Sequence, residues 1–116
     1  MFRFETLEIW KLAVAYGKRL YKIAEKFPKT ETFALADQLK RAAVSVSNNI
    51  AEGSGGTDKD FSNFLNISIK SILETVNILH FAQELGYIGL AAKNEHYEEA
   101  EILIKRIRAF KKTLLP

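Results

Sequence analysis

The sequence contains no cysteine, only two prolines and only six glycines in 116 residues. The absence of cysteine excludes disulfides, thiolate metal sites and cysteine nucleophiles, and it gives no sign of an oxidising compartment. No apolar run approaches the roughly 20 residues that a membrane-spanning helix needs, so we expect no membrane partner. The opening MFRFETLEIW lacks the long apolar core of a signal peptide, so we expect a cytoplasmic protein.

What remains is a chain with helical spacing almost throughout. It is 47% hydrophobic and 27% charged, which is ordinary for a soluble globular protein. Apolar residues recur every three or four positions in four segments, 7–27, 35–50, 57–85 and 97–114. Short connections between long helices favour antiparallel neighbours. The sequence therefore predicts an all-α protein, with residues 1–116 forming one domain folded as an antiparallel up-down four-helix bundle.

The rare prolines and glycines mark the expected helix ends. Pro28 stops the first helix, because proline cannot continue it. Gly53 is predicted to be the residue just beyond the second helix, where a left-handed backbone is common. Thr57 begins the stretch TDKD, which resembles a capping box for the third helix. Gly86 ends that helix.

The third predicted helix is more apolar than a helix of an isolated bundle needs to be. Its apolar side chains cover an arc of about 240°, whereas a stripe somewhat over 100° wide is usual. The members of this arc are Phe61, Phe64, Leu65, Ile67, Ile69, Ile72, Leu73, Val76, Ile78, Leu79, Ala82 and Leu85. Two neighbouring helices within one subunit explain such a surface, and so does contact with a second subunit. We favour the second explanation and expect a homo-oligomer.

A stripe of polar residues follows the edge of the second predicted helix. Its members recur at steps of three or four residues and stack on successive turns: Gln38, Arg41, Ser45, Asn49 and Glu52. A hydrolytic site would need a base beside the serine or a second positioned carboxylate, and neither is evident. Glu52 lies in the last helical turn, where the macrodipole disfavours an anion, so we expect a donor from outside its own helix. We favour a structural seam or oligomer interface, with ligand or nucleic-acid contact as the alternative.

Two groups of basic residues are candidates for phosphate contacts. One arc of the first helix carries Lys11, Lys18, Arg19, Lys22 and Lys26, and the end of the fourth carries Lys105, Arg106, Arg108, Lys111 and Lys112. The net charge of +3 also favours an anionic partner. We expect the first group, together with Arg108 and Lys112, to contact RNA or DNA backbone. The simpler alternative is two solvated helix faces. No aromatic residue is interleaved on either stripe, so base stacking and sequence-specific binding are not expected.

Other chemistry has little support in the sequence. Glu95, His96 and Glu99 could suggest a metal site, but a di-metal bundle needs a Glu-x-x-His pair on two helices. The chain has only two histidines, no Walker loop and no dinucleotide fingerprint. We therefore expect no metal, no cofactor and no enzymatic activity.

The stretch QLKRAAVSVSNNIAEGSGG, residues 38–56, resembles the hallmark of the 23S rRNA intervening-sequence proteins, which reads close to QLRRAAvSIpaNIAEG. Further agreements with that family are Phe4, Leu7, Trp10, Phe27, Pro28, Glu31, Phe61, Phe64, Leu65, Ser71, Glu74, Leu85, Gly86 and Tyr87. Two positions depart from the pattern. Ser47 stands where the family usually has proline, and Lys70 stands where a glycine often precedes the serine.

This resemblance covers nearly the whole chain and implies a four-helix bundle that assembles as a pentamer. It also implies a relation to the accessory proteins of diversity-generating retroelements, which are basic, non-enzymatic and associated with nucleic acid or a reverse transcriptase. From residues and resemblance together we expect a non-enzymatic, oligomeric bundle that binds nucleic acid through basic faces. The alternative is a protein-interaction adaptor, for example for a polymerase or reverse transcriptase, with no direct nucleic-acid binding.

Overall fold

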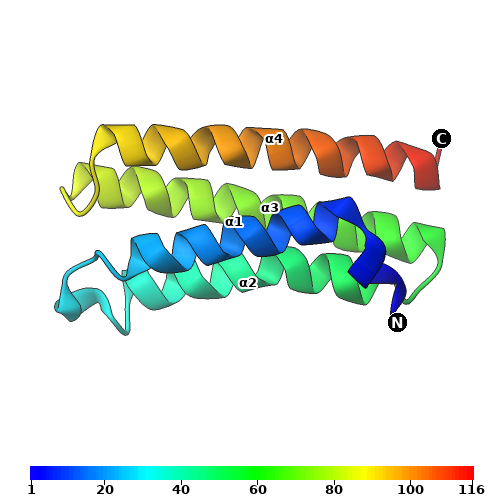
Figure 1. The fold of residues 1–116 in the computed structure, drawn as a ribbon, viewed down its shortest axis with the longest axis horizontal. Coiled ribbons are helices and arrows are strands. Elements are labelled where there is room, and N and C mark those ends of the chain that lie inside the picture. The colour runs from blue at the N-terminus through cyan, green and yellow to red at the C-terminus, as the bar shows by residue number, and fades with distance from the viewer.

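Four long helices account for most of the chain in the computed structural model, which describes residues 1–116 (Figure 1). They are α1 (Glu8–Ala24), α2 (Leu35–Gly53), α3 (Asp58–Glu84) and α4 (Leu90–Leu114). A short 3₁₀ turn, η1 (Arg3–Thr6), precedes α1, and a second, η2 (Lys29–Glu31), lies in the connection between α1 and α2. No strand is present, so the predicted all-α class is confirmed.

The helices are arranged as the four corners of an elongated bundle. Each helix packs against its neighbours in sequence and α1 closes the ring against α4, whereas α1 and α3, like α2 and α4, do not approach each other closely. Neighbouring helices run in opposite directions. Ser45 of α2 meets Ser71 of α3 and the next residue, Val46, meets Ser68. Glu8 at the start of α1 meets Arg106 near the end of α4. The bundle measures 43 × 23 × 20 Å. The predicted antiparallel up-down arrangement is confirmed.

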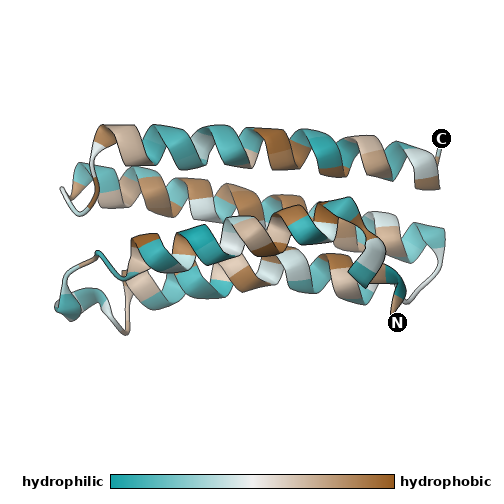
Figure 2. Cartoon of the chain, viewed as in Figure 1, coloured by the Kyte–Doolittle hydropathy of each residue, from teal (hydrophilic) through white to brown (hydrophobic).

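The core is built from the apolar face of each helix. Figure 2 shows apolar and hydrophilic residues alternating around the helices, as expected for amphipathic segments (Figure 2). Leu20, Leu39, Ile72 and Ile107, one from each helix, are fully buried in a single cluster. Burying each such side chain stabilises the fold by about 1.5–3 kcal/mol. One core holds all four helices together.

Two of the predicted helix ends are confirmed. The Thr57 side chain accepts a hydrogen bond from the Asp60 backbone N–H, and the Asp60 side chain accepts one from the Thr57 N–H, so the predicted capping box opens α3. Gly86 has a φ of 78°, which only glycine adopts without cost, and it follows the end of α3. Both ends are therefore set by local chemistry, whereas the first helix already ends at Ala24, before the predicted stop at Pro28.

The prediction for Gly53 was wrong. This glycine is the last residue of α2 itself, is buried, and does not adopt a positive φ. The reason is a close helix–helix contact, because a Cβ at this position would lie 2.7 Å from the Cβ of Phe64 and 2.9 Å from Cδ1 of Phe61. Gly53 is required for packing between α2 and α3, and the chain turns only at the residues that follow.

The fourth helix starts earlier than its apolar pattern indicates. It begins at Leu90, with Gly89 at the N-cap, rather than near residue 97. Its first two turns are rich in alanine and polar residues, which favour helix without giving an apolar stripe. The periodicity therefore marked only the part of α4 that carries most of its core residues.

The surface of α3 is only partly what its sequence predicts. Ile78 and Ala82 are buried within the chain, so two neighbouring helices explain part of the wide apolar arc. Ile67, Leu73 and Leu85 remain 45%, 54% and 49% exposed, and Phe81 is also exposed. No helix combines the length and apolar content needed to cross a membrane.

Candidate nucleic-acid interface

The lysines of α1 form an exposed row. Lys11, Lys18 and Lys22 follow one another at steps of seven and four residues, which places them on one side of the helix, and Lys26 follows in the turn beyond its end. All four side chains are exposed, and none takes part in an ion pair within the chain. We call these four residues the α1 lysine row. It retains four positive charges for an external partner.

Arg19, which the sequence groups with this row, is engaged in a different way. Its guanidinium forms an ion pair with Glu99 of α4. The other oxygen of Glu99 lies 2.6 Å from Nδ1 of His96, which is buried. The three side chains link α1 to α4 and neutralise most of the Arg19 charge. His96 and Glu99, considered above as metal ligands, belong to this link, and no group of three or more acidic or histidine side chains is placed to hold a metal ion.

The basic end of α4 divides in the same manner. Arg106 Nη1 lies 2.7 Å from Glu8 Oε1 of α1, and Lys111 donates a hydrogen bond to the Asn66 side chain of α3. Arg108 and Lys112 are exposed and have no ion-pair partner. These two side chains therefore remain available at the end of the bundle where α4 finishes.

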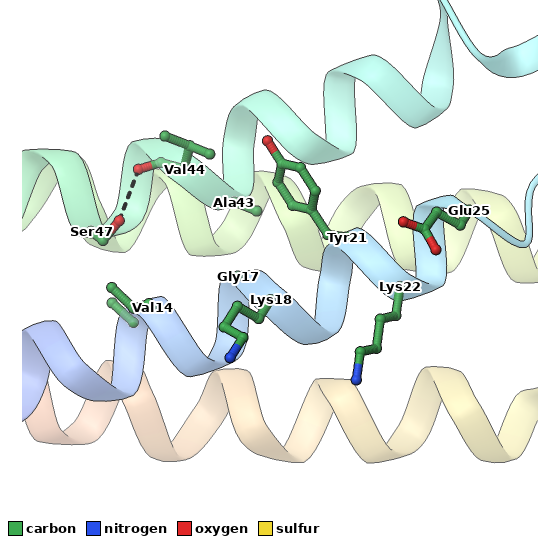
Figure 3. A pocket seen from close by; sticks show the side chains of 10 residues that line it. Val14, Gly17, Lys18, Tyr21, Lys22, Glu25, Ala43, Val44 and Ser47 are labelled. Atoms are coloured by element: carbon green, nitrogen blue, oxygen red, sulfur yellow. Dashed lines mark hydrogen bonds between the residues drawn. The ribbon is translucent and has the colours of Figure 1, made fainter.

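An apolar groove runs between α1 and α2 beside the α1 lysine row. It has a volume of about 410 Å³. It is lined by Ala13, Val14, Gly17, Lys18, Tyr21, Lys22, Glu25, Ala43, Val44 and Ser47. In Figure 3, Tyr21 extends from α1 toward α2, whereas Lys18 and Lys22 extend to the opposite side (Figure 3). A Cβ on Gly17 would lie 3.6 Å from the Ala43 carbonyl oxygen, so the two backbones approach closely beneath the groove.

The polar stripe of α2 separates into two parts. Ser45 and Asn49 form a seam inside the subunit: the Ser45 hydroxyl lies 2.9 Å from that of Ser71 on α3. Asn49 Nδ2 donates to the Ser45 carbonyl at 2.7 Å and to its hydroxyl at 3.0 Å. Ser68 of α3 adds a hydrogen bond to the Val46 carbonyl at 2.8 Å. This half of the stripe joins α2 to α3 through neutral groups.

The other part of the stripe faces solvent. Gln38 and Glu52 are exposed and make no side-chain hydrogen bond or ion pair within the chain. Arg41 is exposed and pairs with Asp37 of the same helix at 2.8 Å. No other helix of the subunit and no glycine-rich backbone supplies the donor that we expect for Glu52. A donor from a second subunit stays a prediction.

A buried hydrogen bond between two hydroxyl groups was not predicted from the sequence. The Tyr16 hydroxyl of α1 lies 2.8 Å from the Thr75 hydroxyl of α3, across the diagonal of the bundle. Burial raises the pKa of Tyr16 to about 12, with the Thr75 hydrogen bond opposing and Glu99 adding to the shift. The signal was present as hydroxyl residues on the apolar face of α3, at positions 68, 71 and 75. Tyr16 stays protonated at neutral pH and acts as a structural link.

Three residues that carry the family resemblance meet at one end of the bundle. The Tyr87 hydroxyl donates a 2.8 Å hydrogen bond to Glu31, and the Tyr87 ring lies 5.7 Å from that of Phe27. These contacts tie the connection between α1 and α2 to the turn between α3 and α4. The agreement at these positions therefore has a structural cause.

Comparison with known proteins points to one family. Residues 5–109 match the family described as the 23S rRNA-intervening sequence protein. A crystal structure from Bacteroides thetaiotaomicron, described as a protein with unknown function from the S23 ribosomal protein family, matches with a TM-score of 0.81 at 21% identity. The match covers 90% of this chain and 98% of that chain, and it shows a shared fold. No curated protein matches the chain.

Proposed function

The chain belongs to the family of 23S rRNA-intervening sequence proteins, and we propose that it is a non-enzymatic, self-associating bundle that binds the backbone of RNA or DNA. The observation that carries the proposal is the α1 lysine row, which holds four exposed cations with no partner in the chain. Phosphate contacts need only lysine or arginine spaced along a surface. Tyr21, the exposed aromatic side chain beside these lysines, extends toward α2 and away from them, so binding should depend little on base sequence (Figure 3).

The ion pairs between α1 and α4 support this assignment of roles. Arg19 and Arg106 already have carboxylate partners, so a phosphate would have to compete with Glu99 and Glu8. The lysines have no carboxylate partner with which a phosphate would have to compete. A lysine that neutralises a phosphate releases counterions condensed on the nucleic acid, and this release supplies much of the affinity. We therefore assign backbone contact to the α1 lysine row, with Arg108 and Lys112 as a second basic group.

Self-association is supported by one face of α3. Ile67, Phe81 and Leu85 are exposed and share the side of α3 that borders Ser71, where α2 meets α3. The solvent-facing members of the α2 stripe, Gln38 and Glu52 among them, lie along the same seam. Apolar side chains rimmed by polar ones are typical of subunit interfaces. The family resemblance suggests five subunits in a closed ring, which would repeat the α1 lysine row around the assembly and raise its avidity.

An adaptor role is the second candidate, and the groove between α1 and α2 favours it. Val14, Tyr21 and Val44 give the groove an apolar floor that a nucleic-acid backbone would not use. A protein partner such as a polymerase or reverse transcriptase would place apolar side chains there. In that case the lysines beside the groove would serve solubility only.

A salt titration distinguishes the two candidates. Binding of the protein to a generic single-stranded RNA is measured between about 50 and 200 mM salt, since four phosphate contacts give a log–log slope near −3. A steep slope with little dependence on sequence supports backbone binding. If no RNA or DNA binds in a salt-dependent manner near about 100 mM salt, the adaptor function replaces the proposal.

Native mass spectrometry tests the assembly separately. At micromolar concentration we expect a closed oligomer, and Phe81→Ser together with Leu85→Ser should dissociate it while leaving helix content unchanged. Leu73→Ser is the matched control, because Leu73 is equally exposed but lies on another side of α3. A wild-type protein that stays monomeric would remove self-association from the proposal.

A further inference from the structure

A second hollow lies at the end of the bundle, between the first turns of α3 and the last turns of α4. It has a volume of about 380 Å³ and is lined by Ser62, Arg108, Lys111, Lys112 and Leu115. Three of its five lining residues are cations, and none is acidic. Asp58, one turn before Ser62, is not among the lining residues. We call this feature the α3–α4 hollow.

Ser62 distinguishes this hollow from an ordinary basic patch. The residue as a whole is only 9% exposed, yet its hydroxyl makes no hydrogen bond within the chain. The other buried hydroxyls of α3, those of Ser68, Ser71 and Thr75, each have a partner. No fully enclosed side-chain polar atom lacks a partner, so the Ser62 hydroxyl opens into the α3–α4 hollow. Because this hydroxyl has no partner within the chain, it is free to donate a hydrogen bond to an acceptor placed in the hollow.

The cations around Ser62 are also available. Arg108 and Lys112 have no carboxylate within ion-pair distance, and Lys111 contacts only the amide oxygen of Asn66. An ammonium group has three donors, so Lys111 keeps two for another acceptor. Arg108 presents a planar fork that suits two oxygens of one oxyanion. The hollow therefore combines three positive charges with a hydroxyl donor in its lining.

We propose that the α3–α4 hollow binds a terminal phosphate monoester of a nucleic-acid strand, an inference that rests on the proposed backbone binding. A terminal phosphate carries a charge of about −1.5 to −2 at pH 7 and offers three strong acceptor oxygens. An internal phosphodiester carries one charge and exposes two such oxygens. Three cations and a hydroxyl match the monoester better. The α1 lysine row holds the strand, and the hollow holds its end.

Helix capping is the competing explanation for part of this arrangement. Lys111 and Lys112 lie in the last turn of α4, where cations interact favourably with the helix dipole. That role accounts for the lysines, but it requires neither Arg108 beside them nor a free hydroxyl on the facing helix. It also predicts a different measurement: removal of a capping cation lowers thermal stability and leaves phosphate selectivity unchanged.

The experiment compares short single-stranded RNAs of one sequence that differ only at their ends. Fluorescence anisotropy measures Kd for strands bearing a 5′-phosphate, a 3′-phosphate or hydroxyls at both ends. At least one phosphorylated strand should bind about tenfold more tightly than the hydroxyl strand. Ser62→Ala should reduce this preference, Arg108→Gln with Lys112→Gln should abolish it, and Arg108→Lys should restore part of it. The two phosphorylated probes show which end is held.

Lys18→Gln is the control for charge. It removes one cation of the α1 lysine row, so it should weaken binding of all three strands and keep their ratio. Equal affinity for phosphorylated and hydroxyl strands would overturn the inference and leave backbone binding intact. Arg108 and Lys112 variants that melt at lower temperature but keep the preference would overturn it in favour of capping. Failure of every strand to bind would overturn both proposals.

Discussion

The seam between α2 and α3 and the seam between α1 and α4 are built by opposite means. The first is the most extensively packed helix pair of the bundle and the second is the least. Between α2 and α3, Gly53 admits two phenylalanine rings, and Ser45 with Ser71 forms a neutral hydrogen bond. Between α1 and α4, the links are ion pairs between long side chains, Glu8 with Arg106 and Arg19 with Glu99.

This difference indicates where the molecule is rigid and where it carries charge. Small residues and hydroxyls allow close approach and are indifferent to salt, so the α2–α3 seam specifies how the helices pack. Long charged side chains bridge a wider gap at the surface, where screening weakens them. The α1–α4 seam therefore contributes less stability. Its ion pairs engage Arg19 and Arg106, whereas the neighbouring α1 lysine row has no acidic partner. The four predictions below test this contrast, beginning with the largest effect.

Gly53→Ala should damage the α2–α3 seam most. The new methyl would lie 2.7 Å from the Cβ of Phe64, which is fixed to the helix backbone, so the helices must separate. We expect a loss of about 3 kcal/mol in unfolding free energy, measured by chemical denaturation. Gly17→Ala is the matched control, because its methyl would meet only ordinary contacts, the nearest at 3.6 Å. It should stabilise α1 by about 0.5–1 kcal/mol. Equal effects would contradict the packing argument.

Tyr16 lies beneath the α1–α4 seam and gives the protein a pH dependence. Burial raises its pKa from 10.0 to about 12, so the folded protein holds this proton where the unfolded chain has lost it. Stability is therefore full below pH 10.0 and falls as the pH rises toward about 12. The loss should amount to about 2–3 kcal/mol. Tyr16→Phe should show a shallower fall over the same range. Parallel curves for the two proteins would show that Tyr16 titrates normally.

Ser45 and Ser71 test the neutral link of the α2–α3 seam. A double-mutant cycle with Ser45→Ala and Ser71→Ala should give a coupling of about 1 kcal/mol. Because neither group is charged, the coupling should stay constant between about 0.05 and 1 M salt. Asn49 also donates to the Ser45 hydroxyl, so only the cycle, and not a single variant, isolates the pair. A coupling that vanished at high salt would mean that the α2–α3 seam depends on charge, as the α1–α4 seam does.

Glu8 and Arg106 give the smallest expected effect. Their side chains are 69% and 55% exposed, so a cycle with Glu8→Gln and Arg106→Gln should give a coupling of about 0.5 kcal/mol or less. It should disappear near 1 M salt, where the screening length falls to about 3 Å. A larger, salt-resistant coupling would mean that the α1–α4 seam is more strongly shielded from solvent than its exposure indicates.

The sequence predicts local features of this fold well, because they depend on local chemistry. Helical periodicity, the Thr57 capping box and the Gly86 turn follow from spacing and backbone preference alone. Gly53 was assigned wrongly because its role depends on Phe61 and Phe64, which approach it only in the folded bundle. The start of α4 was missed because alanine and polar turns carry no apolar period.

The candidate sites divide along the same line. An exposed lysine row can be read from spacing within one helix. The partners of Arg19 and Arg106 cannot, because Glu99 and Glu8 come from helices distant in sequence. The role of Ser62 cannot be predicted from the sequence, because only the folded structure shows that its hydroxyl has no hydrogen-bond partner. A single sequence therefore predicts where the helices form, but not which side chains pair between them.

The salt dependence of RNA binding in a charge variant tests the central claim most directly. Lys11→Gln, Lys18→Gln and Lys22→Gln together remove three cations from the α1 lysine row and change the net charge from +3 to zero. The control variant Lys29→Gln, Lys59→Gln and Lys70→Gln makes the same change at exposed, dispersed positions. We expect the first variant to lose about two units of log–log salt slope and most of its affinity, with helix content and assembly unchanged, while the control keeps most of both. If the two variants lose the same slope, net charge alone governs binding and the α1 lysine row is not the interface.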